Sequence, residues 1–308
     1  MNFKEAVCGQ EGKKIMSVKL AVIPVAGKGT RLIPLTKSLP KEMLPVGRKP
    51  VVQYVVEELN RCGLQKLLFI TGQTKTAIEN HFDLDMELIN HLRQTGKEDL
   101  LMELAFEKAD LQYFYTRQRR QLGLGHAILC AESFVGREPF VVALGDTILG
   151  VNAKARVVER MIKVFEERNA DAVIAFEEVP ENEVHRYGIA APVDLTDPNV
   201  FQLANIVEKP SKEEAPSHLA VASRYVFQPE IFEYLKVTKP GKNDEIQLTD
   251  AIQAMIADGK NVYGVRVTPE EHRFDIGNYA SYFAAFLEFA VADPDHGEEI
   301  RKKIREFI

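Results

Sequence analysis

The stretch LAVIPVAGKGTRLIPLTKSLPKEMLPV, residues 20–46, decides how the rest of the chain is interpreted. Its first seven residues are apolar and have the length of a buried strand. Gly27 and Gly29 come next, and residues 27–49 contain six basic side chains against one acid, Glu42. Ligands of open α/β sheets bind beyond the carboxyl ends of the strands, and glycines let the backbone approach them. The stretch therefore predicts a polyphosphate site after the first strand, with a solvated basic turn as the alternative.

Apolar strands and helical segments alternate through the first half of the chain. Strands are expected at 20–26, 67–72, 111–116 and 139–146, and helices at 50–63 and roughly 153–168. Because these strands are continuous apolar runs, helices should cover both faces of their sheet. Residues 85–109 look like a charged, helical insertion, and residues 187–227 contain further strands without a long helix between them. The expected fold class is α/β, with a Rossmann-like, mixed, mainly parallel sheet flanked by helices and an appended second half.

Composition and charge exclude several classes of protein. The 308 residues carry a net charge of −6, so a basic surface for nucleic acid is not expected. No apolar run approaches the roughly 20 residues that span a bilayer, so no membrane partner is expected. Cys8, Cys62 and Cys130 are widely spaced and odd in number, which favours reduced thiols in the cytoplasm. Residues 1–16 lack apolar periodicity and are expected to form a disordered N-terminal extension.

Other nucleotide and nucleophile motifs do not fit. A dinucleotide fingerprint needs a third glycine where this chain has Leu32, and Pro34 then delays any helix. The phosphate-binding loop GxxxxGK[ST] is absent, as are GxSxG and HExxH. These absences weaken the interpretation as a nicotinamide oxidoreductase or an ATPase.

A series of motifs, all in register along the chain, carries a family resemblance. The pattern GxGTRLxPxTxxxPKxxLPV, which contains PKEMLPV, is followed in order by ENHFD, GLGHA, VEKP and DEIQLTDAI, between Ala21 and about Ala290. This series resembles the sugar nucleotidyltransferases, and within them the bacterial UTP–glucose-1-phosphate uridylyltransferases. The resemblance implies an enzyme that transfers a uridylyl group from UTP to glucose 1-phosphate, giving UDP-glucose and pyrophosphate. It also implies in-line attack without a covalent intermediate, Mg²⁺ as the metal cofactor, and a homodimer or homotetramer.

The resemblance also assigns a role to particular residues and halves of the chain. It implies a catalytic domain at 17–290, with nucleotide binding in its first half and sugar binding in its second, and a C-terminal helical tail at 291–308. The implied catalytic residues are Arg31, Lys41, Asp146 and Lys209, and Asp146 and Asp275 would bind the metal. The implied nucleotide-binding residues are Ala26, Gly27, Gly29, Glu42, Gln118 and Gly123. The implied sugar-binding residues are Tyr187, Gly188, Glu208 and Lys209.

Three positions depart from the uridylyltransferase pattern, and two alternatives stay open. Gly145 stands where a proline is usual, Leu122 where a lysine often precedes GLGHA, and Ser223 where GRY has its glycine. The sequence LGD is the form of thymidylyltransferase relatives, so glucose-1-phosphate thymidylyltransferase is the first alternative. The second is a catalytically inactive regulator that binds a sugar nucleotide. His126 is expected to pack or to form hydrogen bonds at a helix start rather than to catalyse.

Overall fold

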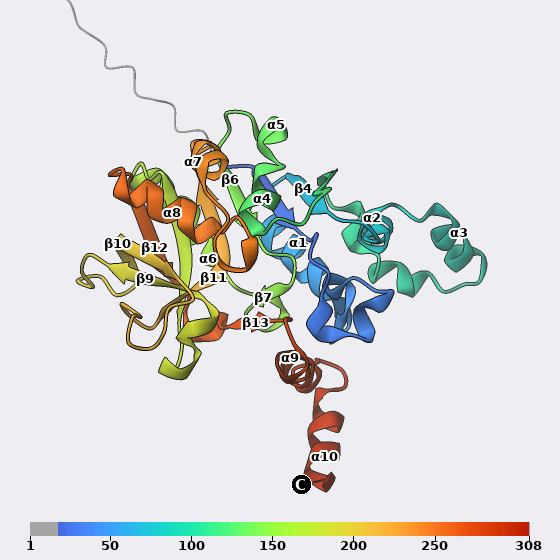
Figure 1. Ribbon diagram of the computed structural model, residues 1–308. Helices are drawn as coiled ribbons and strands as arrows, with labels where there is room; N and C mark the ends of the chain where they lie inside the picture. The colour runs from blue at the N-terminus through green and yellow to red at the C-terminus, as the bar shows by residue number, and fades with distance from the viewer. Residues whose placement is uncertain (1–17, 308) are drawn as a thin grey trace, which may run out of the picture.

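The computed structural model describes residues 18–307, which form a nine-stranded sheet flanked by helices (Figure 1). The strand order is β5-β4-β1-β6-β11-β8-β12-β10-β9. The strands are β1 (Leu20–Pro24), β4 (Lys66–Thr71), β5 (Gln112–Arg117), β6 (Phe140–Ala143), β8 (Ala172–Glu178), β9 (Gly188–Pro192), β10 (Val200–Glu208), β11 (Leu219–Phe227) and β12 (Val262–Arg266). In this sheet β10 and β11 run opposite to the other strands, which confirms the mixed, mainly parallel α/β fold.

Two short ladders lie outside the main sheet. Strand β2 (Pro45–Val46) pairs with β3 (Lys49–Pro50), and β7 (Thr147–Leu149) pairs with β13 (Arg273–Asp275). The helices are α1 (Val51–Arg61), α2 (Thr76–Phe82), α3 (Met86–Gln94), α4 (Leu124–Leu129), α5 (Glu132–Val135), α6 (Val157–Glu167), α7 (Ile231–Val237), α8 (Leu248–Ala257), α9 (Tyr279–Val291) and α10 (Gly297–Phe307).

Strand β1 shows why the apolar runs are continuous. Ala21 and Ile23 pack in the core beneath α1, α2 and α6, whereas Leu20 and Val22 pack in the core beneath α4, α7 and α8. Successive side chains of a strand point to opposite faces, so a strand covered on both sides must be apolar at every position. The burial of both faces also explains why the first half folds as a parallel sheet with crossover helices.

The structure corrects the bounds of one predicted helix and subdivides the insertion. Helix α6 begins at Val157 rather than near 153, because Gly150 and Asn152 adopt positive φ and break the helix before it. Residues 85–109 form α3 followed by two short 3-10 turns, and this insertion projects to one side of the body (Figure 1). The predicted extension, residues 1–16, lies outside the described residues.

The C-terminal helices extend from the body in Figure 1. Tyr282, Ala285 and Phe289 of α9 pack in a core with Tyr54 of α1 and Phe274 of β13. Helix α10 follows α9 and leads away from the sheet. Among residues 18–307, no helix combines the length and apolar character needed to cross a membrane.

Candidate active site

Two cavities lie along the edge of the sheet at which the parallel strands β1, β4, β5 and β6 end. The first is formed by the segments after β1, β4 and β5, and the second by those after β6 and β10 together with β9, β11 and the start of α8. The second cavity has a volume of about 390 Å³. Parallel strands end at the same edge of a sheet, so loops far apart in the sequence converge there. Both of these cavities therefore lie at the edge predicted from residues 20–46.

The predicted nucleotide-binding residues surround the first cavity. Ala26, Gly27 and Gln118 line it. Gly29 adopts φ 66°, and its carbonyl accepts a hydrogen bond of 2.7 Å from Thr36 Oγ1, which folds the basic loop over the end of β1. Gly123 precedes α4 with φ 99°, and a side chain there would lie 2.7 Å from Glu245 Cβ. Only glycine fits that position without a shift of the backbone.

An ion pair between Lys41 and Asp146 lies at the boundary of the two cavities. A side chain at Gly27, which lines the first cavity, would lie 3.6 Å from Lys41 Cε, and the Lys41 ammonium donates a hydrogen bond to Asp146 Oδ2, whose residue lines the second cavity. Burial alone would lower the pKa of Lys41, but the carboxylates of Asp146 and Glu42 outweigh it and raise that pKa. Burial likewise would raise the pKa of Asp146, but Lys41 holds it below its usual value. Both groups are therefore charged at neutral pH.

Glu42 has a different environment from the one expected. Its side chain is 1% exposed, and its Oε2 accepts a hydrogen bond of 2.7 Å from Lys75 Nζ, which is itself 6% exposed. A carboxylate so enclosed has no surface with which to contact a nucleotide. Lys75, in contrast, lines the first cavity from the loop after β4. Lys75 was not predicted from the sequence, because a single lysine after the strand 67–72 matches no motif. Its position just beyond the end of a strand was the one sequence feature that could have indicated a place at the site.

The β7–β13 ladder brings the two predicted metal ligands together. Asp275 pairs in register with Thr147, the residue after Asp146, and the Ile276 amide donates to the Asp146 carbonyl over 3.0 Å. Burial and the neighbouring charge of Asp146 raise the pKa of Asp275. Two carboxylates more than a hundred residues apart thus share one short ladder beside the second cavity, and their charges repel.

We expect Asp275→Asn to raise the melting temperature of the metal-free protein by a few degrees at pH 7.5. A carboxyl group whose pKa is raised by folding destabilises the folded state once it ionises, because the unfolded chain holds that charge at lower cost. The gain should shrink as the pH falls toward the raised pKa, where Asp275 takes up a proton. Thermal melts of both proteins from pH 4.5 to 8 with a chelator measure this. A lower melting temperature for the variant at pH 7.5 would contradict the assigned repulsion.

The predicted sugar-binding residues line the second cavity. Glu208 accepts hydrogen bonds from Lys209 Nζ over 2.6 Å and from Thr249 Oγ1 over 2.7 Å, so the carboxylate is fixed at the end of β10. Lys209 adopts φ 46°, which turns the chain sharply after Glu208. Gly188, the first residue of β9, pairs in register with Glu208, and the Lys209 amide donates a hydrogen bond of 2.9 Å to the Tyr187 carbonyl, so both residues line the cavity beside Glu208. Thr249, at the first turn of α8, was not predicted, and only its place in DEIQLTDAI pointed to it.

Two arginines enclose Tyr187. Its ring faces the Arg273 guanidinium at 4.0 Å and the Arg186 guanidinium at 5.2 Å, and both arginines line the second cavity. Such cation–π contacts hold the ring rigidly. Neither arginine was singled out from the sequence, because they lie 87 residues apart and converge only through the fold. Arg31, predicted from the basic loop after β1, also lines this second cavity.

The three departures from the family pattern have structural explanations. A side chain at Gly145 would lie 2.4 Å from Val25 Cγ1, so glycine lets the loop after β6 pack on β1. Leu122 acts through its backbone, since its carbonyl accepts a hydrogen bond of 2.8 Å from the Ile246 amide. Ser223 adopts φ 60° and its Oγ lies 3.3 Å from Thr147 Oγ1, within the second cavity. None of the three changes a predicted ligand of the nucleotide.

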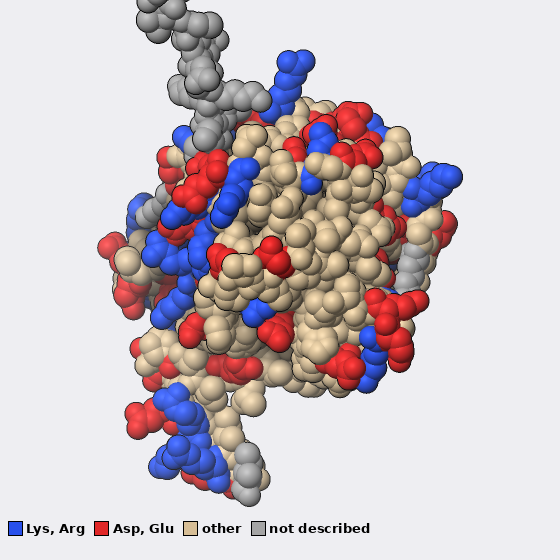
Figure 2. All heavy atoms as spheres, turned by 90° about the vertical axis from the view of Figure 1, so that its left-hand side faces the viewer, with Lys and Arg blue, Asp and Glu red and all other residues tan. Residues whose placement is uncertain are grey.

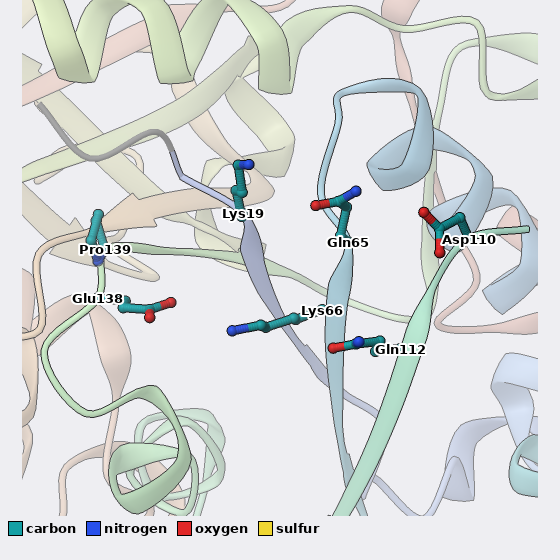
Figure 3. A pocket seen from close by; sticks show the side chains of 7 residues that line it. All are labelled: Lys19, Gln65, Lys66, Asp110, Gln112, Glu138 and Pro139. Carbon is teal, nitrogen blue, oxygen red and sulfur yellow. The ribbon is translucent and has the colours of Figure 1, made fainter.

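Another hollow lies at the opposite edge of the sheet, where β1, β4 and β5 begin (Figure 3). Its lining residues are Lys19, Gln65, Lys66, Asp110, Gln112, Glu138 and Pro139. Two lysines face two carboxylates there, so the hollow has no excess of positive charge for a polyphosphate. On the face shown in Figure 2, basic and acidic side chains are intermixed around a wide uncharged area. That face therefore lacks a continuous basic surface of the kind that nucleic acid binds.

Comparison with known proteins agrees with this geometry. A family model described as nucleotidyl transferase matches residues 20–291. The chain belongs to the nucleotidyl transferase family. A UTP–glucose-1-phosphate uridylyltransferase from Staphylococcus haemolyticus (strain JCSC1435) is 43% identical over 289 residues, or 94% of this chain and 98% of the relative. The resemblance inferred from the series of sequence motifs is confirmed.

Two solved structures extend the comparison to the fold. A UTP-bound UGPase from Acinetobacter baumannii is 38% identical and has a TM-score of 0.86, covering 94% of this chain and 100% of that one. A UDP-glucose pyrophosphorylase in complex with UDP-glucose is 35% identical and has a TM-score of 0.80, covering 90% and 100%. The family fold therefore spans nearly the whole of the described chain.

Proposed function

We propose that the chain transfers a uridylyl group from UTP to glucose 1-phosphate, giving UDP-glucose and pyrophosphate. The observation that carries the proposal is the Lys41–Asp146 pair, which joins the loop that lines the first cavity to a residue that lines the second. Phosphoryl transfer depends on holding two anionic substrates in line and on neutralising the charge between them. The relatives that match over the same length are described as acting on UTP and glucose 1-phosphate, or as bound to UTP or UDP-glucose.

The proposed reaction needs positioning rather than a protein nucleophile. An oxygen of the sugar phosphate attacks the α-phosphorus of UTP, and pyrophosphate leaves on the opposite side. Arg31 and Lys41 neutralise the triphosphate and the departing pyrophosphate, because both lie beside the boundary of the cavities. Lys209, which lines the second cavity, neutralises the phosphate of the sugar. No covalent intermediate with the chain is required.

The cavities divide the substrates between them. In the first, the backbone at Ala26, Gly27 and Gly29 approaches the nucleotide, and Gln118 and Gly123 face the base. In the second, the Tyr187–Gly188 backbone and the Glu208 carboxylate hold the sugar hydroxyls.

The sequence-based role of Glu42 as a nucleotide contact is revised. Because Glu42 is enclosed by Lys75, we propose that it positions the Lys75 ammonium toward the nucleotide cavity. Lys75 then joins Lys41 in facing the anionic substrate, and Glu42 acts only through these two lysines.

The pair Asp146 and Asp275 fits a divalent cation, for which we propose Mg²⁺. Magnesium prefers one or two carboxylates and completes its shell with water and substrate phosphates. The two carboxylates are held side by side by the β7–β13 ladder, and their mutual repulsion raises the pKa of Asp275. Among the described residues, no group of three or more acidic, histidine or cysteine side chains is placed to hold a metal ion. When bound, the ion would neutralise charge at the α-phosphate.

We expect UTP to be preferred to dTTP by roughly 10–200-fold in kcat/KM, with weaker use of CTP and ATP. Thymine differs from uracil by one methyl group, and one methyl group supports discrimination of only that size. A pyrophosphate-release assay with glucose 1-phosphate and each of the four nucleotides measures the preference. Equal or better use of dTTP would favour the thymidylyltransferase alternative. No pyrophosphate release with any nucleotide would favour an inactive regulator, although Arg31, Lys41, Asp146 and Lys209 are all present.

A homodimer or homotetramer and a cytoplasmic location remain predictions, as does the division into an extension, a catalytic domain at 17–290 and a tail.

A further inference from the structure

The amide of Gln118 is held in a single orientation. Gln118 is 6% exposed and lines the first cavity. Its Nε2 donates to the Gly123 carbonyl over 3.0 Å and also lies 3.0 Å from His126 Nδ1. A carbonyl oxygen only accepts hydrogen bonds, so the atom that faces Gly123 must be the amide nitrogen. Both hydrogens of that nitrogen are then used, one by Gly123 and the other by His126.

The partners that fix the amide are themselves fixed. The Ile246 amide donates to the Leu122 carbonyl over 2.8 Å, and the Gly125 amide donates to the Ile246 carbonyl over 2.9 Å. These two bonds clamp the 122–125 loop to the segment before α8, and Gly123 leaves no room for a side chain. The Gly123 carbonyl therefore cannot turn away from Gln118 without loosening the start of α4.

His126 can accept this hydrogen bond only as a neutral ring. Nδ1 must carry a lone pair, so the proton of the neutral imidazole lies on Nε2. Burial and the charge of Arg120 lower the pKa of His126, which favours the neutral ring. The acceptor is therefore present at neutral pH.

The fixed orientation of the Gln118 amide determines which pyrimidine base it can bind. With both N–H groups engaged, Gln118 has only Oε1 to offer, and no described residue donates a hydrogen bond to that oxygen. Uracil and thymine both present an N3–H donor, which matches an acceptor. Cytosine presents N3 as an acceptor, so it would face Oε1 with like polarity. An amide free to rotate could satisfy either base, whereas the fixed amide cannot.

We propose that His126 is a positioning residue that, with Gly123, locks the Gln118 amide so that the site accepts uracil and rejects cytosine. This inference rests on the proposed function, since it requires that Gln118 faces the base. The fixed Gln118 amide discriminates by rejecting cytosine, and it does not distinguish uracil from thymine.

The test compares three variants with the parent enzyme. His126→Leu removes the acceptor, His126→Asn places an amide oxygen near the position of Nδ1, and His126→Gln places its polar group near Nε2 instead. Each is assayed for pyrophosphate release with UTP, dTTP and CTP, and for the KM of glucose 1-phosphate. We expect the UTP-over-CTP ratio of kcat/KM to fall by about 10–100-fold in His126→Leu and His126→Gln and to be largely retained in His126→Asn. The UTP-over-dTTP ratio and the KM of the sugar phosphate should stay unchanged in all three.

The outcomes separate this inference from the proposed function. A parent enzyme that does not use UTP would defeat the proposed function itself. If the parent enzyme uses UTP and the His126→Leu variant rejects CTP as strongly as the parent does, only the proposed role of His126 is overturned. An equal loss with all three nucleotides would mean that His126 merely supports the fold of α4, and would also overturn it. If His126→Leu does not fold, the contrast between His126→Asn and His126→Gln gives the same decision.

Discussion

Asp146→Asn is expected to lower turnover by a factor on the order of 10²–10³. That is the scale measured when one strong electrostatic contact is removed from a preorganised site. Asparagine keeps the shape of the side chain but removes the charge that pairs with Lys41 at the boundary of the cavities and repels Asp275. The measurement is kcat for pyrophosphate release with saturating UTP and glucose 1-phosphate, across a magnesium titration. Added magnesium should recover part of the loss if metal affinity is what fails.

A matched control and a double variant sharpen this expectation. Asp110 lines the hollow at the opposite edge of the sheet, so Asp110→Asn should leave kcat unchanged. Asp275→Asn should resemble Asp146→Asn, and the double variant should lose less than the product of the two single effects, because both carboxylates act through one ion. Turnover near that of the parent in Asp146→Asn would remove this residue from the proposed site.

Arg224→Met is expected to reduce the free energy of unfolding by about 3–5 kcal/mol, the usual cost of leaving a buried charge without its partner. Arg224 and Glu58 are 0% and 1% exposed, and their groups are joined by hydrogen bonds of 2.7 and 3.2 Å. Arg224 also donates to the backbone carbonyls of Thr147 and Ser223, each over 3.0 Å. The variant would leave the Glu58 carboxylate unpaired on the buried face of α1. Urea unfolding followed by circular dichroism measures the change.

Removing both members of the pair supplies the control. Arg224→Met with Glu58→Leu should recover most of the lost stability, since apolar residues of similar volume often replace a buried ion pair at little cost. The double variant should still lose turnover, because the Thr147 carbonyl no longer has a donor to hold the strand that follows Asp146. A single Arg224→Met variant as stable as the parent would show that the ion pair contributes little to this core.

The sequence by itself determined the class of fold and the edge at which the site lies. Continuous apolar runs such as 20–26 can be buried only in a sheet covered on both faces, and a glycine-rich basic loop at the end of such a strand lies where ligands of α/β folds bind. These are local consequences of side-chain chemistry and of the period of a strand, so neighbouring residues suffice to reveal them. The start of α6 was predicted too early because the backbone turn at Asn152 has no strong sequence signal.

The tertiary structure alone decided which charges meet. Asp146 faces Asp275 only because β7 pairs with β13, and Glu42 is enclosed by Lys75 only because the loops after β1 and β4 end at the same edge. The orientation of the Gln118 amide likewise depends on a loop clamped to Ile246, far along the chain. Electrostatic and hydrogen-bond energies depend on distance in space and on exclusion of water, and the order of residues along the chain fixes neither.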